Sequence, residues 1–309
     1  MKYILLLAII AAILGCDDFT SEVRYDDSVY TLTGLLYEGE SVTVDNAIFI
    51  GRSIDAYGGN LNNVIIDNAL VKLYNVTRND SIQLEFVIVP PQNDGDLPLI
   101  GYYDPTGSFN IFANETYRIK ADIPVDNTYI SLEATTIIPD SIVANVLQDT
   151  AFISDPLNEF PELVFDTANQ EHPLNIGTFS PETVKLKVEF YCLEEYNNAY
   201  YIQDFPGAND TPEDEEEYED PIWGFPRKIW YYTEYNPNPT NEDYYLIIDA
   251  GYKVNFIFYG RYKLTVSSVD ENYYNFLYMT NNYLHGGIIN GFGYFGSVSE
   301  DVIYTKVVE

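Results

Sequence analysis

Residues 66–74 read Ile66-Asp67-Asn68-Ala69-Leu70-Val71-Lys72-Leu73-Tyr74, and their pattern points to the fold class of this chain. Within it, Val71 and Leu73 flank Lys72, and this alternation with a period of two is typical of a strand that buries one face. Segments of the same kind recur along the chain, and turn signals such as Gly58-Gly59-Asn60 and Asp94-Gly95 separate them. Many short strands at this spacing predict an antiparallel β-sandwich.

The first unit of the chain, residues 29–139, is predicted to form this Ig-like sandwich. Pro139-Asp140 follows the last alternating segment, so the sequence predicts a domain boundary there. The expected strands are Val29–Tyr37, Val42–Gly51, Asn63–Asn75, Ser81–Pro90, Gly107–Phe112, Tyr117–Ile123 and Thr128–Ile138.

The second unit, residues 140–309, is predicted to be a β-rich domain with one capped α-helix. A stretch rich in proline and acidic residues, 154–182, is expected to separate its first strand from the rest. The expected strands are Ser141–Phe152, Thr183–Leu193, Ala199–Phe205, Ile222–Tyr235, Tyr244–Asp249, Gly251–Val266 and Val302–Val308, with a further segment at Asn290–Tyr294.

The predicted helix begins at Ser268-Val269-Asp270-Glu271, which fits a capping box. In a capping box the hydroxyl of the first residue accepts from the backbone N–H of the fourth, whose carboxylate reaches back. After this start, apolar residues follow at helical spacing and share one face. They are Tyr273, Phe276, Leu277 and Leu284.

The N-terminus, residues 1–15, has the pattern of a signal peptide. Lys2 carries a positive charge, and the apolar run from Tyr3 to Leu14 is shorter than the roughly 20 residues that cross a bilayer. Ile13-Leu14-Gly15-Cys16 resembles a lipobox, which predicts that the Cys16 thiol takes up lipid. An ordinary secretory signal is the alternative, but no A-x-A-like cleavage site precedes Cys16. Residues 16–28 are then an acidic tether.

The charge balance excludes several classes of partner. The chain has 15 basic and 48 acidic residues, a net charge of −33, and removal of residues 1–15 takes away only the charge of Lys2. Such a surface repels the phosphates of nucleic acids and, beyond the tether, an anionic membrane. It favours association with cations.

Few residues offer catalytic or metal-binding chemistry, and we expect neither an enzyme nor a cofactor. The acidic run Asp210–Asp220 is rich in hard oxygen ligands for Ca²⁺, but it lacks the spacing of a calcium loop, and a solvated loop is the simpler interpretation. His172 and His285 are the only histidines. Cys192 lies on the apolar side of an alternating segment, which predicts a buried thiol.

Four aromatic residues form the candidate contact surface. They are Trp223, Trp230, Tyr231 and Tyr232, close in sequence to two basic residues. Rigid aromatic side chains stack on sugar rings and anchor protein partners. Packing between strands is the alternative interpretation of the same residues.

The chain also resembles two known families. Asp67–Leu73, and Gly107-Ser108-Phe109 followed by Glu115-Thr116-Tyr117-Arg118-Ile119, resemble the motifs of a carboxypeptidase-regulatory-like sandwich, although Glu115 stands near a common turn glycine. The whole chain is similar to the Bacteroidota lipoprotein family called domain of unknown function 4249. The matching segments are the lipobox, Thr135–Ser141, Asn198–Tyr201, Tyr273-Tyr274 and Asn290–Gly296.

The second resemblance implies an outer-membrane lipoprotein, exposed at the cell surface when an acidic pair such as Asp17-Asp18 follows the lipidated cysteine. The alternative is that this pair is only part of a solvated acidic tether and that the protein faces the periplasm. It implies an accessory role beside a TonB-dependent uptake system and carries over no catalytic residue. The sequence therefore predicts a non-enzymatic binding or accessory module. A cell-surface glycan-binding protein is the first alternative, and a hydrolase of unknown type is the second.

Overall fold

The computed structural model describes residues 29–53, 64–91, 98–145, 152–154, 159–164, 171–177, 185–194, 200–201, 229–232, 244–249, 258–279 and 285–309. These residues form a mainly β structure with one α-helix, as the sequence predicts. The predicted signal peptide and tether, and with them Cys16, lie outside the described residues. Within the described part, no helix is long and apolar enough to span a membrane.

A five-stranded antiparallel sheet forms one layer of the N-terminal sandwich. Its strand order is β5 (Leu99–Tyr103), β4 (Asp80–Val89), β3 (Leu70–Asn75), β6 (Thr116–Val125) and β7 (Thr128–Ile137). The alternation in the sequence sets which face is buried. Along β6, for example, Tyr117, Ile119 and Ala121 are fully buried, and more exposed residues stand between them.

The other layer belongs to an eight-stranded sheet. Its main order is β13 (Ile229–Tyr232), β11 (Lys185–Cys192), β15 (Phe258–Val269), β16 (Phe292–Val308), β1 (Tyr30–Tyr37) and β2 (Phe49–Arg52). Two short strands join it, β12 (Tyr200–Tyr201) beside β15 and β9 (Glu162–Val164) beside β16. The sheet is mixed, because β1 and β9 both pair with β16 in parallel.

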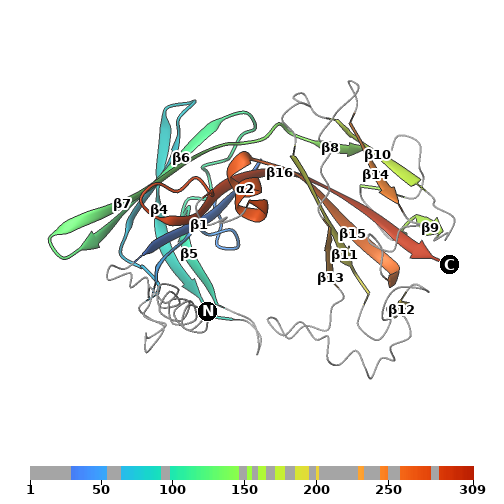
Figure 1. The fold of residues 1–309 in the computed structure, drawn as a ribbon, viewed down its shortest axis with the longest axis horizontal. Coiled ribbons are helices and arrows are strands. Elements are labelled where there is room, and N and C mark those ends of the chain that lie inside the picture. Colours follow the sequence, from blue (N-terminus) through green and yellow to red (C-terminus); the bar gives the residue numbers. More distant parts are fainter. Residues whose placement is uncertain are drawn as a thin grey trace, which may run out of the picture.

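A three-stranded sheet completes the strands that the structure describes. Its order is β14 (Tyr244–Asp249), β10 (Glu171–Gly177) and β8 (Val143–Asn145). Figure 1 shows β16 running from beside the five-stranded sheet to the opposite end of the molecule, where the C-terminus lies. The last strand of the chain therefore connects the two ends of the structure.

The sandwich core contains residues from both ends of the sequence. Leu32 and Leu36 of β1 belong to the same buried cluster as Leu73 of β3 and Leu132 of β7. Phe295 of β16, which is fully buried, joins them. The domain boundary predicted at residue 139 stays a prediction, but the core of residues 30–138 includes a side chain from beyond it.

The glycine-rich segment Asn290–Gly296 allows β16 to lie close to its neighbours. Gly293 has a φ of 105°, and a Cβ atom there would lie 2.1 Å from the carbonyl oxygen of Leu32 on β1. At Gly296, a Cβ atom would lie 2.6 Å from the Cβ atom of Tyr273 on the helix. The glycines that carry the family resemblance thus have a packing role in this structure.

Two predicted elements need correction, and the structure contains one strand that the sequence did not predict. Gly107–Phe112 is not a strand, because its backbone turns around Asp104. The stretch 154–182, predicted as a separator, contains β9 and β10, and β5 was not foreseen at all.

The cap of the helix also differs from the prediction. The helix α2 (Glu271–Tyr278) has Asp270 as its N-cap, and the Asp270 carboxylate accepts from the backbone N–H groups of Asn272 and Tyr273. Ser268, the predicted cap, lies within β15 and is buried. The strand therefore continues through Ser268 and Val269, two residues further than the predicted cap allows. Leu284, expected on the apolar face of the helix, lies outside the described residues.

Candidate functional site

A cleft of about 520 Å³ lies where the end of β7 meets the start of α2. The segment Ile138-Pro139-Asp140 forms one wall, and Val269-Asp270-Glu271 forms another. Asn114 and Lys185 also line the cleft. Residues more than a hundred positions apart thus meet in one place, because the cap of α2 packs against the end of β7.

The Asp270 carboxylate anchors the inner wall. Its Oδ1 accepts from the backbone N–H groups of Tyr273 and Ser297, each at 3.0 Å. Its Oδ2 accepts from the hydroxyl of Thr136 at 2.7 Å and from the backbone N–H of Asn272 at 3.2 Å. Burial raises the pKa of Asp270 above its ordinary value, although these hydrogen bonds oppose the shift.

The Thr136 hydroxyl links Asp270 to Ser297. The hydroxyl oxygens of Thr136 and Ser297 lie 2.8 Å apart, and Ser297 donates to the carbonyl oxygen of Ile137 at 3.0 Å. Because the Thr136 hydroxyl donates to Asp270, these groups connect the cap of α2 with β16 and with the end of β7.

Asp140 contributes an unsatisfied acceptor to the wall of the cleft. The residue is only 7% exposed, and its Oδ1 accepts from the Asn114 side-chain amide. Its Oδ2 exposes less than 1 Å² and has no hydrogen-bond partner among the described residues. A buried carboxylate oxygen without a donor is uncommon, because its lost hydration is not replaced.

The lining of the cleft is more acidic than basic. Asp140, Asp270 and Glu271 carry carboxylates, and Lys185 is the basic residue of the lining. The Lys185 ammonium lies 4.2 Å from the centre of the Tyr274 ring, so an aromatic face already holds it. No cluster of three potential metal-ligating side chains occurs among the described residues. Chemically, the cleft can accept hydrogen bonds from a ligand.

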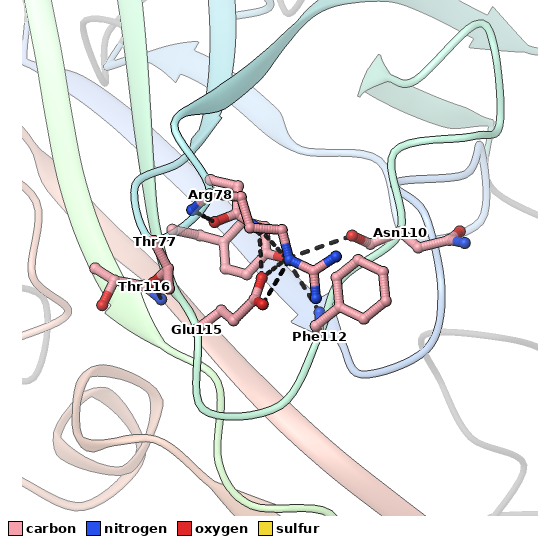
Figure 2. Close-up of polar contacts among 8 residues, drawn as sticks. Thr77, Arg78, Asn110, Phe112, Glu115 and Thr116 are labelled. Atoms are coloured by element: carbon pink, nitrogen blue, oxygen red, sulfur yellow. Dashed lines mark hydrogen bonds and ion pairs between the residues drawn. The ribbon is translucent and has the colours of Figure 1, made fainter.

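A second polar cluster lies in the five-stranded sheet at the turns that flank β3 and β6 (Figure 2). Glu115 accepts from the Asn75 amide at 2.5 Å and from the Arg78 guanidinium at 2.6 Å. The same guanidinium lies 3.7 Å from the centre of the Phe112 ring. Buried Tyr117 accepts from Asn75 at 2.9 Å and from the Phe112 backbone N–H at 3.0 Å.

This second cluster holds the turns in place. Burial alone would raise the pKa of Glu115, but the hydrogen bonds from Asn75 and Arg78 lower it below its ordinary value. Glu115 is thus a charged acceptor for two partners that come from a different turn. In the sequence, Glu115 stands near a turn glycine that is common in the carboxypeptidase-regulatory-like motif. That position gave no sign that Glu115 accepts hydrogen bonds from Asn75 and Arg78.

A third cluster lies on the face of the eight-stranded sheet that α2 covers. The Tyr294 ring packs 4.5 Å from the Phe276 ring and 5.2 Å from the Tyr273 ring. Lys187 on β11 pairs with Glu189 on the same strand. Burial raises the pKa of Tyr294 to about 12.

The structure places only some of the residues singled out in the sequence. Cys16, Trp223 and the acidic run Asp210–Asp220 lie outside the described residues. Trp230, Tyr231 and Tyr232 form part of β13, at the end of the eight-stranded sheet, where they pair with Phe190, Glu189 and Val188 of β11. The prediction that their side chains contact a partner or a sugar stays a prediction.

The other singled-out residues are not part of the lining of the cleft. Cys192 is 1% exposed, which confirms the prediction of a buried thiol. His172 lies on β10, and His285 is exposed in the turn before Gly286. Sequence reasoning missed the cleft itself, although the predicted capping box Ser268–Glu271 and the predicted boundary Pro139-Asp140 both contribute residues to its lining.

A scan against models of known protein families finds no match for this chain, and a search of curated proteins finds none either.

Proposed function

We propose that this protein is a lipid-anchored, non-catalytic binding module of the bacterial outer membrane, exposed at the cell surface, and an accessory to TonB-dependent uptake. The observation that carries the proposal is the apolar run Tyr3–Leu14 followed directly by Gly15-Cys16. The resemblance to the family called domain of unknown function 4249 supports it. The acidic tether of residues 16–28 would separate the folded body from the lipid.

The cleft supports binding over catalysis. The Thr136 hydroxyl and the Asp270 carboxylate hold each other, and Asp270 also holds the start of α2. Their polar atoms therefore maintain the fold at this place and are not poised as a nucleophile with a base. Glu271, which is exposed in the lining, offers an acceptor to a ligand that donates hydrogen bonds.

Metabolic labelling with a palmitate analogue tests the anchor. We expect the wild-type protein to carry label and to fractionate with the outer membrane. Cys16→Ser should remove the label and release the protein, whereas Cys192→Ser, which changes the other cysteine, should leave labelling intact. An unlabelled wild-type protein would refute the proposal, and so would a Cys16→Ser variant that still carries label.

Affinity purification tests the accessory role. The tagged protein, extracted from outer membranes in mild detergent, should retain a TonB-dependent transporter after washing. The Cys16→Ser variant, expressed to the same level, should retain less of it, because the anchor concentrates both proteins in one membrane. Recovery of no transporter from cells grown on several nutrient sources would contradict the role.

Glycan binding is the second candidate function. It is favoured by the consecutive aromatic residues Trp230, Tyr231 and Tyr232 on β13, the end strand of the described sheet order. A glycan array probed with the wild-type protein and Trp230→Ala tests it. Tyr129→Ala is the matched control, since Tyr129 is an exposed aromatic residue on a distant hairpin. Equal signals from wild type and Trp230→Ala would exclude this role for Trp230.

A further inference from the structure

We propose that the face of the eight-stranded sheet beside α2 binds a neutral ligand with several hydroxyl groups, of the sugar class. The site consists of the aromatic and charged cluster around Tyr294 together with Tyr37 and Glu300 of the same face. The inference deepens the proposed binding function and rests on it, because it names the chemical class of the ligand and the residues that hold it.

The register of the strands places the charged residues of this site side by side. Lys187 on β11 lies opposite Ser267 on β15, and Ser267 lies opposite Glu300 on β16. Glu189 follows Lys187 by two residues, so it belongs to the same face and forms an ion pair with Lys187. The Ser267 hydroxyl donates to Glu300 Oε1 at 2.7 Å. One ammonium and two carboxylates therefore share a small area of the sheet.

Two tyrosines from different elements border these charges. Tyr37 on β1 lies opposite Val298, two residues before Glu300 on β16, which places it on the same face. Burial raises the pKa of Tyr37, and the charge of Glu300 raises it further. On α2, the centre of the Tyr273 ring lies 5.7 Å from the Lys187 ammonium. The helix and β1 thus enclose the charged residues from two sides.

Several polar atoms of the site are open to a ligand. Glu300 is exposed, and within the described part of the chain only its Oε1 accepts a hydrogen bond. The hydroxyl groups of Tyr37 and Tyr294 have no hydrogen-bond partner among the described residues, although both residues are half-buried. A phenol can donate one hydrogen bond and accept another, whereas a carboxylate only accepts. The site therefore needs a ligand that both donates and accepts.

This requirement favours hydroxyl groups over charged groups. An ammonium group only donates, so it leaves the phenol protons unused, and it would lie near the ammonium of Lys187. A carboxylate or phosphate group only accepts, and Glu300 and the net charge of −33 repel it. A hydroxyl group donates to Glu300 and accepts from a phenol without either repulsion.

The aromatic rings of the site fit the apolar side of a sugar ring. The Tyr294 ring lies 4.5 Å from the Phe276 ring and 5.2 Å from the Tyr273 ring, so the three rings form one patch. All three residues are half-buried and keep part of their surface open. The C–H groups of a sugar pack on aromatic rings while its hydroxyl groups turn toward polar partners. Both kinds of surface adjoin here.

Saturation-transfer NMR on the full chain, in a detergent without a sugar headgroup, tests the proposal. We expect saturable binding of at least one of the neutral hexoses glucose, galactose and mannose. Cyclohexanol, which keeps a ring with a single hydroxyl, and cyclohexylamine, which is a cation, should bind at least fivefold more weakly. Absence of saturable binding by all three hexoses would overturn the proposal, as would equal or tighter binding of either control compound.

Two conservative variants locate the sugar on this face. Tyr37→Phe removes one hydroxyl and keeps the ring, and Glu300→Gln removes the charge and keeps an oxygen for Ser267. We expect each variant to bind the hexose at least fivefold more weakly while its thermal unfolding stays close to that of the wild type. Tyr129→Phe and Glu85→Gln are the matched controls, because both residues are exposed and belong to the five-stranded sheet. The controls should bind as the wild type does.

The outcomes separate this inference from the proposed function. Unchanged hexose binding in both Tyr37→Phe and Glu300→Gln would refute the assignment to this face, and a loss of binding in Trp230→Ala alone would assign the sugar to β13 instead. Either result leaves the labelling of Cys16 unaffected. Conversely, a wild-type protein without lipid that still binds hexose through Tyr37 and Glu300 would refute the anchor and keep this site.

Discussion

Asp104 shows how one carboxylate can redirect a segment of backbone. It is 3% exposed and accepts from the Thr106 hydroxyl at 2.6 Å, and from the backbone N–H groups of Thr106, Ser108 and Phe109 at 2.7 to 3.0 Å. These N–H groups would otherwise be available to a strand partner. The alternation of Gly107–Phe112 predicted a strand because a period of two does not reveal a competing acceptor five residues upstream.

Asp104 and Asp270 should respond to pH in opposite directions. Burial opposes ionisation of both, but the hydrogen bonds to Asp104 lower its pKa below 3.8, whereas burial leaves the pKa of Asp270 raised. The stability from Asp104 is therefore present above pH 3.8 and is lost as pH falls through the folded value. The stability from Asp270 is present below 3.8 and is lost as pH rises through its folded value.

Urea unfolding of Asp104→Asn and Asp270→Asn across the acid range measures this contrast. We expect Asp104→Asn to cost about 2–3 kcal/mol at neutral pH, with a smaller deficit in acid. For Asp270→Asn the deficit should shrink as pH rises, because only the wild type then ionises a buried carboxyl group. Two deficits that change with pH in the same direction would contradict the assignment.

Glu115 and Arg78 should contribute unequally, although they form one ion pair. Glu115→Ala leaves buried Asn75 without its charged acceptor, so we expect a loss of about 2–3 kcal/mol. Arg78→Ala removes a half-exposed partner, and a loss of about 1 kcal/mol or less is expected. Chemical denaturation of the two single variants checks the order. A larger loss for Arg78→Ala would show that the stacking on Phe112 dominates the cluster.

At the scale of elements, α2 and β16 depend on each other. The N-cap Asp270 accepts from the backbone N–H of Ser297, and Gly296 leaves room for Tyr273. The sequence predicted the helix from its spacing of aromatic residues, and the structure confirms it. The exact cap was missed because Ser268 and Asp270 both suit an N-cap, and only the length of β15 decides between them.

Gly293→Ala tests the approach of β16 to β1. The added Cβ would lie 2.1 Å from the Leu32 carbonyl oxygen, at a φ that favours glycine, so we expect a loss of more than about 4 kcal/mol. Gly107→Ala is the control, since Gly107 also has a positive φ of 61° but no atom within 4 Å of the added Cβ. Its loss should be about 1 kcal/mol. Thermal unfolding distinguishes the two, and similar losses would remove the packing explanation.

At the scale of the whole molecule, the pairing of β1 with β16 organises the fold. Seven residues of β1, Thr31–Tyr37, pair in parallel with Phe292–Val298. The fold class follows from local alternation, so the sequence could predict it. The pairing of β1 with β16 does not follow from local alternation, because a pattern around residue 30 holds no information about a strand more than 250 residues away. For the same reason, the cleft beside α2 could not be foreseen.

A fragment of residues 29–139 should therefore not fold stably alone. It would lack Phe295 in its core and leave β1 without its parallel neighbour. We expect the spectra of the fragment to be broad and to show no cooperative change as denaturant is added. In the full chain, the amides of β1 should be protected from hydrogen exchange. Addition of a peptide spanning residues 288–309 should restore part of the protection in β1, as measured by hydrogen exchange. Cooperative unfolding of the fragment by itself would instead establish residues 29–139 as an autonomous domain.

Because β16 is the last strand in the sequence, it is synthesised long after its partner β1, and this affects how the protein is made. A ribosome makes about 5–20 residues per second, so roughly 10–50 s separate the synthesis of β1 from that of its partner. During this interval β1 lacks its partner β16, so one edge of this apolar strand is unpaired. An unpaired edge can pair with other chains and lead to aggregation. Nascent chains of this protein should depend on a holdase chaperone until the final residues emerge.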